Sequence, residues 1–142
     1  MAPSRRATRI AAVAAASLLA ACAQADKRPT EESIDNVWHK AKLRGVAFRA
    51  VGQEPGWLLE IIDGEEILLV TNYGANRKSL PYVDPVVYQH ERRTQYVLSD
   101  YSTTIEIRGE ACTDTMNGEL FEVSVTLYLE DKELKGCGRA LF

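Results

Sequence analysis

The nine residues Phe121-Glu122-Val123-Ser124-Val125-Thr126-Leu127-Tyr128-Leu129 carry the clearest structural signal in this chain of 142 residues. Apolar side chains occupy every odd position, and the positions between them are charged, hydroxylated or amphipathic. Successive side chains of a β-strand point to opposite faces, so strict alternation predicts a strand with one buried and one solvated face. The segment therefore predicts a β-rich domain.

The same period of two recurs on both sides of this segment. The dipeptides Asp63-Gly64 and Asp131-Lys132 supply turns, and residues 73–85, which include Pro81 and Pro85, predict a loop. The predicted strands are residues 46–51, 57–62, 66–72, 86–91, 94–99, 103–108, 121–129 and 133–141. About eight short strands with hairpin-length connections predict a small antiparallel barrel or meander, and a sandwich is the alternative. We favour a barrel, because closure removes exposed sheet edges.

One short helix is expected before the first strand, over residues 30–45. Thr30 is suited to cap its start, and Gly45 is placed to end it. Its apolar residues recur at helical spacing and predict one face that packs on the domain; they are Ile34, Val37, Trp38 and Ala41.

The first 21 residues are unlike the rest of the chain. Arg5, Arg6 and Arg9 precede an apolar run over residues 10–21, which is the pattern of a secretory signal peptide. The run is shorter than the roughly 18 residues that a membrane-spanning helix needs. The alternative is a buried or interfacial N-terminal helix.

The end of that run, Leu19-Ala20-Ala21-Cys22, resembles the bacterial lipobox. The resemblance implies cleavage before Cys22 and acyl chains, such as palmitate, on its sulfur. Residues 22–29 then form a lipidated cysteine and tether, and residues 30–142 form a single β-rich domain. Because Ala23 stands where inner-membrane lipoproteins commonly have Asp, the resemblance favours an outer-membrane anchor that faces the periplasm.

The charge of the remaining chain argues against nucleic acid as a partner. The whole chain has 17 Lys and Arg against 20 Asp and Glu. The first 21 residues hold three of the basic residues and none of the acids, so the rest has a net charge of −6. A surface this acidic gives no electrostatic attraction to phosphate backbones or anionic head groups.

Two cysteines remain once Cys22 is lipidated, and we expect Cys112 and Cys137 to form a structural disulfide, because an exported chain meets an oxidising compartment. The alternatives are a metal pair and a redox pair. Zinc needs four ligands, and His39 and His90 are isolated in the sequence. A redox pair usually has Cys-x-x-Cys spacing, which is absent. No metal or cofactor is therefore expected.

Three short motifs resemble those of a family of mostly uncharacterised bacterial lipoproteins. They are Gly52-Gln53-Glu54-Pro55-Gly56-Trp57, Cys112-Thr113-Asp114-Thr115-Met116-Asn117-Gly118 and Gly136-Cys137-Gly138. Gln53 stands where the family has Asn, and Asn117 where it has Ser. The resemblance implies no enzymatic activity. Its relatives sometimes share chains with META-type and lysozyme-inhibitor-type envelope modules, which indicates work in the cell envelope without specifying it.

The motif residues allow a structural and a functional interpretation. In the structural one, Trp57 is an apolar plug at one mouth of the barrel, and Asp114 and Asn117 fix a turn closed by Gly118. In the functional one, four residues line a shared recess: Glu54, Trp57, Asp114 and Met116.

A non-enzymatic binding or maintenance protein of the cell envelope is the expected function. Its partner would be an envelope protein or a small ligand, besides the membrane reached through Cys22. The alternative is a lysozyme-inhibitor-like protein that binds a basic envelope-degrading enzyme by charge attraction. An enzyme is not expected, because no nucleophile elbow or metal-binding motif is present. Metal delivery through Met116 and His90 has weaker support, since the two are far apart in the sequence.

Overall fold

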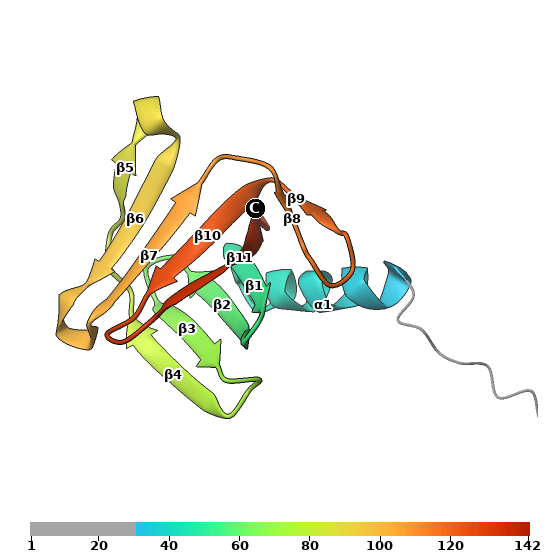
Figure 1. Cartoon of the computed structure of the whole chain (residues 1–142), viewed down its shortest axis with the longest axis horizontal. Coiled ribbons are helices and arrows are strands. Elements are labelled where there is room, and N and C mark those ends of the chain that lie inside the picture. The colour runs from blue at the N-terminus through green and yellow to red at the C-terminus, as the bar shows by residue number, and fades with distance from the viewer. Residues whose placement is uncertain (1–30) are drawn as a thin grey trace, which may run out of the picture.

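The computed structural model describes residues 31–142, and its main feature is an antiparallel sheet of nine strands that curls into a half-barrel (Figure 1). The predicted signal peptide, Cys22 and the tether lie outside the described residues. The strands of the sheet are β1 (Phe48–Gln53), β2 (Gly56–Ile62), β3 (Glu66–Thr71), β4 (Asn76–Pro81), β5 (Val86–Tyr88), β6 (Arg93–Leu98), β7 (Thr103–Arg108), β10 (Val123–Tyr128) and β11 (Glu133–Ala140). A separate ribbon consists of β8 (Cys112–Thr113) and β9 (Leu120–Phe121). The predicted mainly β fold is confirmed.

Two meanders make up the sheet, and the first and last strands join them. The strand order is β4-β3-β2-β1-β11-β10-β7-β6-β5. β1 and β11 pair with Val51 opposite Cys137 and Phe48 opposite Ala140. Hairpins connect the neighbours within each meander, and short 3-10 turns, η1 (Gln89–Glu91) and η2 (Ser99–Tyr101), follow β5 and β6.

The sheet curls strongly but its two edge strands are not paired with each other, so the predicted barrel is open. Only residues 82–85 link β4 to β5, and such a link spans less than about 20 Å. Tyr82 and Val83 in this link pack on the core, and the Tyr82 and Tyr96 rings lie 6.2 Å apart. Side chains of this link therefore cover the core between the unpaired edge strands β4 and β5.

The edge strand β4 corrects the prediction of a loop over residues 73–85. Five of its six residues are exposed, and only Leu80 is buried, so no alternation marks the strand in the sequence. Lysine and proline are typical of edge strands, because they discourage pairing with another chain. β4 has Lys78 in its middle and Pro81 at its end.

The helix α1 (Glu31–Leu43) confirms the predicted N-terminal helix. It ends at Leu43, and Gly45, which follows in the closing turn, has a positive φ of 85° and donates its N–H to the Lys42 carbonyl at 2.9 Å. Trp38 and Ala41 are buried, whereas Val37 is 44% exposed, so the packed stripe is narrower than predicted.

The apolar residues form two cores on opposite faces of the sheet. The larger core fills the inside of the half-barrel and includes Leu59, Ile105 and Leu127. The smaller core lies outside, where α1 places Trp38 against Phe121 at 5.6 Å between ring centroids. Phe121 joins this outer core because the predicted strand over residues 121–129 breaks at Glu122 into β9 and β10.

Candidate functional site

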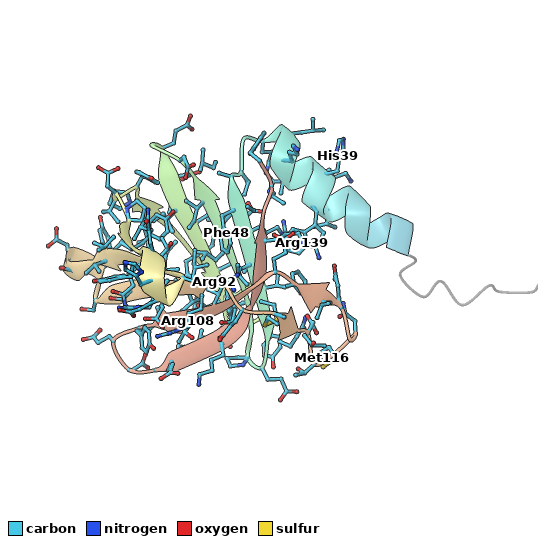
Figure 2. All side chains as sticks on the ribbon, turned by 90° about the horizontal axis from the view of Figure 1, so that it is seen from above. His39, Phe48, Arg92, Arg108, Met116 and Arg139 are labelled. Atoms are coloured by element: carbon cyan, nitrogen blue, oxygen red, sulfur yellow. A yellow bond between two sulfur atoms is a disulfide. The ribbon has the colours of Figure 1, made fainter. Side chains whose placement is uncertain are left out.

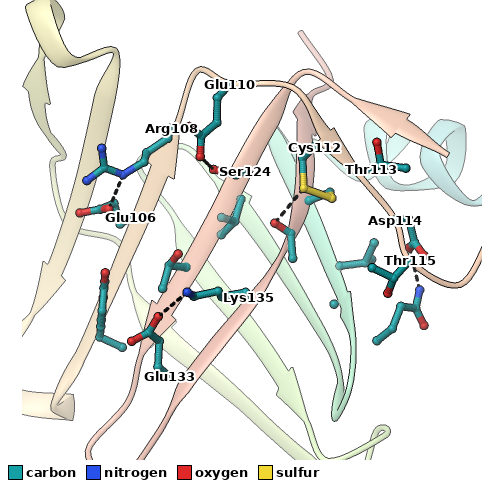
Figure 3. A pocket seen from close by; sticks show the side chains of 18 residues that line it. Glu106, Arg108, Glu110, Cys112, Thr113, Asp114, Thr115, Ser124, Glu133 and Lys135 are labelled. Carbon is teal, nitrogen blue, oxygen red and sulfur yellow. Dashed lines mark hydrogen bonds and ion pairs between the residues drawn. A yellow bond between two sulfur atoms is a disulfide. The ribbon is translucent and has the colours of Figure 1, made fainter. Parts of the chain in front are cut away.

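An open groove of about 490 Å³ runs over the outer face of the sheet (Figure 3). Its floor consists of outward-facing side chains of β7, β10, β11 and β1, among them Ser124, Thr126 and Lys135. Residues 110–115 close one side and belong to the connection between β7 and β10. We call residues 110–119 the wall loop. Because β7 and β10 are themselves paired, with Arg108 opposite Ser124, the wall loop is a long hairpin loop that folds back over its neighbours.

The charged floor residues neutralise one another. The Glu106 carboxylate accepts hydrogen bonds from Arg108 Nε at 2.7 Å and from Gln95 Nε2 at 2.8 Å, and Arg93 lies at 3.5 Å. Burial alone would raise the pKa of Glu106, but these hydrogen bonds and guanidinium charges outweigh it and hold the pKa below its ordinary value. Lys135 pairs with Glu133 at 3.2 Å.

The wall loop carries two carboxylates without a basic partner. Glu110 accepts a hydrogen bond from the Ser124 hydroxyl at 2.6 Å. Asp114 is only 6% exposed and accepts hydrogen bonds from Gln53 Nε2 and from backbone N–H groups. Among the described residues, neither carboxylate lies within ion-pairing distance of a Lys or Arg. The groove is therefore net acidic along its wall.

The sequence of the wall loop explains its shape. The Asp114 carboxylate accepts the Met116 N–H at 2.7 Å, and Asn117 Oδ1 accepts the Glu119 N–H at 2.8 Å. Gly118 has a positive φ of 73° and donates its N–H to the Asp114 carbonyl at 2.9 Å. Asp and Asn side chains stabilise turns in this way, and glycine adopts a positive φ without strain. The turn predicted from Asp114, Asn117 and Gly118 is present.

The predicted disulfide between Cys112 and Cys137 is confirmed, with 5.5 Å between the two Cα atoms. It joins the wall loop to β11 on the outer face of the sheet. The alternative in which these two cysteines bind a metal as a pair is thereby excluded, because both sulfurs are bonded to each other. Within residues 31–142, no three His, Cys, Asp or Glu side chains come together in an arrangement that could hold a metal ion.

Of the four residues predicted to line a shared recess, the structure brings only Asp114 to the groove. Trp57 is buried in the inner core, on the other side of the sheet. Glu54 is exposed on the β1–β2 turn. Met116 is 68% exposed at the outer tip of the wall loop (Figure 2). The motif over residues 52–57 nevertheless contacts the motif over residues 112–118, because Gln53 donates a hydrogen bond of 2.8 Å to Asp114.

Trp57 fills a space that two glycines leave open, which agrees with the structural interpretation of its motif. A Cβ atom at Gly52 would overlap the indole, and one at Gly136 would lie 2.6 Å from indole Cζ2. The indole N–H donates to the Lys135 carbonyl at 3.2 Å. Gly138 leaves similar room for the Phe48 ring, at 2.7 Å from a Cβ built there. These glycines therefore accommodate aromatic rings inside the half-barrel, whereas the disulfide lies on the opposite face.

The floor of the groove was not predicted as a site from the sequence, although one signal pointed to it. Ser124, Thr126 and Tyr128 form the polar face of the alternating segment, and all three line the groove. Polar residues on that face are ordinarily explained by contact with solvent. Here the Cys112–Cys137 disulfide holds the wall loop over the same face.

Comparisons of the chain with protein-family models, curated proteins and solved structures find no match. Within residues 31–142, no helix is long and apolar enough to cross a membrane. The function is therefore inferred from the chain's own residues.

Proposed function

We propose that this protein is a lipid-anchored, non-enzymatic binding protein of the cell envelope, and that its ligand occupies the groove beneath the wall loop. The observation that carries the proposal is the groove itself. Its volume of about 490 Å³ lies within the roughly 300–1,000 Å³ that is usual for small-molecule sites. Four strands of a paired sheet form its floor, and a rigid floor can hold polar groups in fixed positions.

The lining supports binding better than catalysis. The groove offers hydroxyls, carboxylates and amides, which recognise a polar ligand through hydrogen bonds. Among its lining residues there is no histidine, and the Glu110 carboxylate that accepts the Ser124 hydroxyl has no further hydrogen-bond partner among the described residues to orient it as a base. The proposed address comes from the sequence alone, from the signal-like residues 1–21 and the lipobox-like stretch that ends at Cys22.

A photo-crosslinking pull-down from the native envelope tests this proposal. The photoreactive residue benzoylphenylalanine replaces Thr115 or Tyr128, which line the groove, or Asp100, which is exposed in η2 away from it. We expect an adduct from the two groove positions and none from Asp100. Equal adducts at all three positions, or none in the groove, would contradict the proposal.

A filled groove gives an independent test with a matched control. Thr126→Trp places an indole on the groove floor. Thr104→Trp makes the same change on the same face of the neighbouring strand, at a residue that does not line the groove. We expect only Thr126→Trp to abolish crosslinking while both variants stay folded. If both variants bind alike, the groove is not the site.

A second candidate is a lysozyme-inhibitor-like protein that binds a basic envelope-degrading enzyme. It is favoured by the two carboxylates of the wall loop that have no basic partner, Glu110 and Asp114, because a cationic surface would neutralise them. Glu110→Gln should then weaken binding to a basic lysozyme in low salt. Glu65→Gln, which removes an exposed acid on the β2–β3 turn, should not. Unchanged affinity of the Glu110 variant would exclude this candidate.

A further inference from the structure

The wall loop is attached to the nine-stranded sheet almost entirely by side chains. Glu110 N–H donates to the Arg108 carbonyl where the loop begins. Beyond that point, the backbone hydrogen bonds of the described loop residues stay within the loop and the β8–β9 ribbon. No strand of the main sheet pairs with β8 or β9.

Among the described residues, the polar non-covalent attachments of the loop to the sheet are few, and only the one at Glu110 is exposed. They are the Gln53–Asp114 and Ser124–Glu110 hydrogen bonds and the ion pair of 2.8 Å between Arg139 and Glu119. Single hydrogen bonds and ion pairs that remain partly open to solvent contribute little to stability, about 0–1.5 kcal/mol each. The Cys112–Cys137 disulfide is the one covalent attachment, and it joins the loop to the strand at the middle of the floor.

The two ends of the loop are also held by contacts other than the S–S bond. Gly109 N–H donates to the Arg92 carbonyl at 2.8 Å before the loop, and Phe121 packs on Trp38 after it. The strands that the loop connects, β7 and β10, are paired over five residue positions. Local opening of a segment needs less free energy than global unfolding where few contacts hold it. The loop can therefore leave the sheet while the sheet itself stays paired.

We infer that the Cys112–Cys137 disulfide is a redox gate for the groove, an inference that rests on the proposed binding function. In the oxidised protein the bond holds the wall loop beside the floor and the groove exists. A dithiol reductant breaks the S–S bond through a mixed disulfide; two electrons and two protons yield two thiols, and the reductant leaves as its own disulfide. The wall loop then moves away, and the polar floor becomes an open sheet surface.

The gate would make binding depend on the compartment. A chain that has not yet met an oxidising environment has free thiols and no complete groove, whereas an oxidised chain carries the assembled site. Five residues of the wall loop line the groove, namely Glu110, Cys112, Thr113, Asp114 and Thr115. Removing this wall takes away both carboxylates without a basic partner, so the reduced form loses the most acidic part of the site.

Hydrogen–deuterium exchange of the folded protein tests the gate without any ligand. The oxidised wild type, the reduced wild type and the Cys112→Ser/Cys137→Ser variant are compared. We expect the amides of residues 110–119 to lose at least about tenfold more protection without the disulfide than the β10–β11 and β2–β3 amides, which should lose only what the lower free energy of global unfolding accounts for. The double variant should not respond to reductant. Gln53→Ala, which removes only one hydrogen bond of the loop, should change exchange far less.

Two results of the exchange experiment would overturn the gate. Unchanged protection of the loop after reduction would show that the side-chain contacts suffice to hold it. Equal loss of protection throughout the sheet would show that the disulfide is a global staple. In parallel, acetyl-Lys-Lys-Lys-amide serves as a cationic probe of the groove, and we expect at least tenfold weaker binding to the reduced form. Equal binding to both forms would refute the gate. If the peptide binds neither form, the groove does not bind cations and that part of the proposed function fails. The hydrogen–deuterium exchange of residues 110–119 then tests the gate by itself.

Discussion

Replacing Trp57 by alanine should destabilise the domain by about 4 kcal/mol, because the indole is a core element and not part of a binding site. The side chain is 5% exposed and packs in the inner core of the half-barrel. A tryptophan buries about 150–250 Å², worth roughly 4–6 kcal/mol at about 25 cal/mol per Å². Measured losses for such deletions are about 3–5 kcal/mol. The Lys135 carbonyl also loses its hydrogen bond from the indole.

Urea unfolding followed by circular dichroism measures this loss. A loss of this size approaches the whole stability of a small domain, about 5–15 kcal/mol, so Trp57→Phe provides a milder second variant that should remain folded. We expect the phenylalanine variant to lose less than the alanine variant, because part of the ring is kept. A change below about 1 kcal/mol for Trp57→Ala would refute the assignment of Trp57 to the core.

A substitution at Gly136, which lies against the indole, tests the same packing from the other side. Gly136→Ala should cost about 1–3 kcal/mol or more in the wild type, because the new Cβ would overlap the Val51 carbonyl oxygen and would also lie 2.6 Å from indole Cζ2. In the Trp57→Ala background only the part of the cost that comes from the indole should disappear, since the closer overlap with the Val51 carbonyl oxygen remains. Equal costs in both backgrounds would show that the indole and the glycine do not interact.

The remaining predictions concern the groove, the disulfide and the anchor. The pKa of Glu106 is lower in the folded protein than its ordinary value of 4.5. The ionised carboxylate therefore stabilises the fold at pH values above 4.5, and this contribution is lost as the pH falls through the folded pKa. Glu106→Gln should flatten the dependence of the unfolding free energy on pH in that range, and an unchanged slope would contradict this. Cys112→Ala should cost about 2–5 kcal/mol, and mass spectrometry of the non-reduced protein should show the Cys112–Cys137 bond; free thiols in protein from its native compartment would overturn it. Asp114→Ala should lower the unfolding free energy by about 1–3 kcal/mol, because three hydrogen-bond donors lose their acceptor. Glu54→Ala should change it by no more than about 0.5 kcal/mol. A stable Glu54 variant that lacks the envelope function would show that Glu54 is a binding residue after all. Cys22→Ser should abolish palmitate incorporation and release the protein from the membrane fraction, and labelled palmitate in the variant would count against the lipoprotein proposal.

The sequence predicted well those elements whose signals are local. The helix over residues 31–43 ends just before Gly45 as expected, because a glycine with positive φ is a local stop signal. β7 matches its prediction over residues 103–108, and β11 is shorter than predicted by one residue. Strands that bury one face leave a period of two in the sequence, whereas β4, in which only Leu80 is buried, leaves none.

The candidate site was harder to predict, because its parts come from distant positions. Asp114 was predicted and does line the groove, while Trp57 lies on the opposite face of the sheet. A motif shows which residues occur together, but the face to which each side chain points depends on strand register. The polar residues Ser124 and Thr126 could be assigned to one face from alternation, yet nothing local shows what covers that face.

The sequence by itself determined the β class, the short helix and the cysteine pair, because alternation, capping and residue count are properties of short segments or of composition. The tertiary structure alone decided that β1 pairs with β11 and that the sheet stays open between β4 and β5. It also decided that the wall loop covers the outer face of β10 and β11 and forms a groove there. These features depend on pairings between residues far apart in the chain, whose register is set by the packing of the whole core.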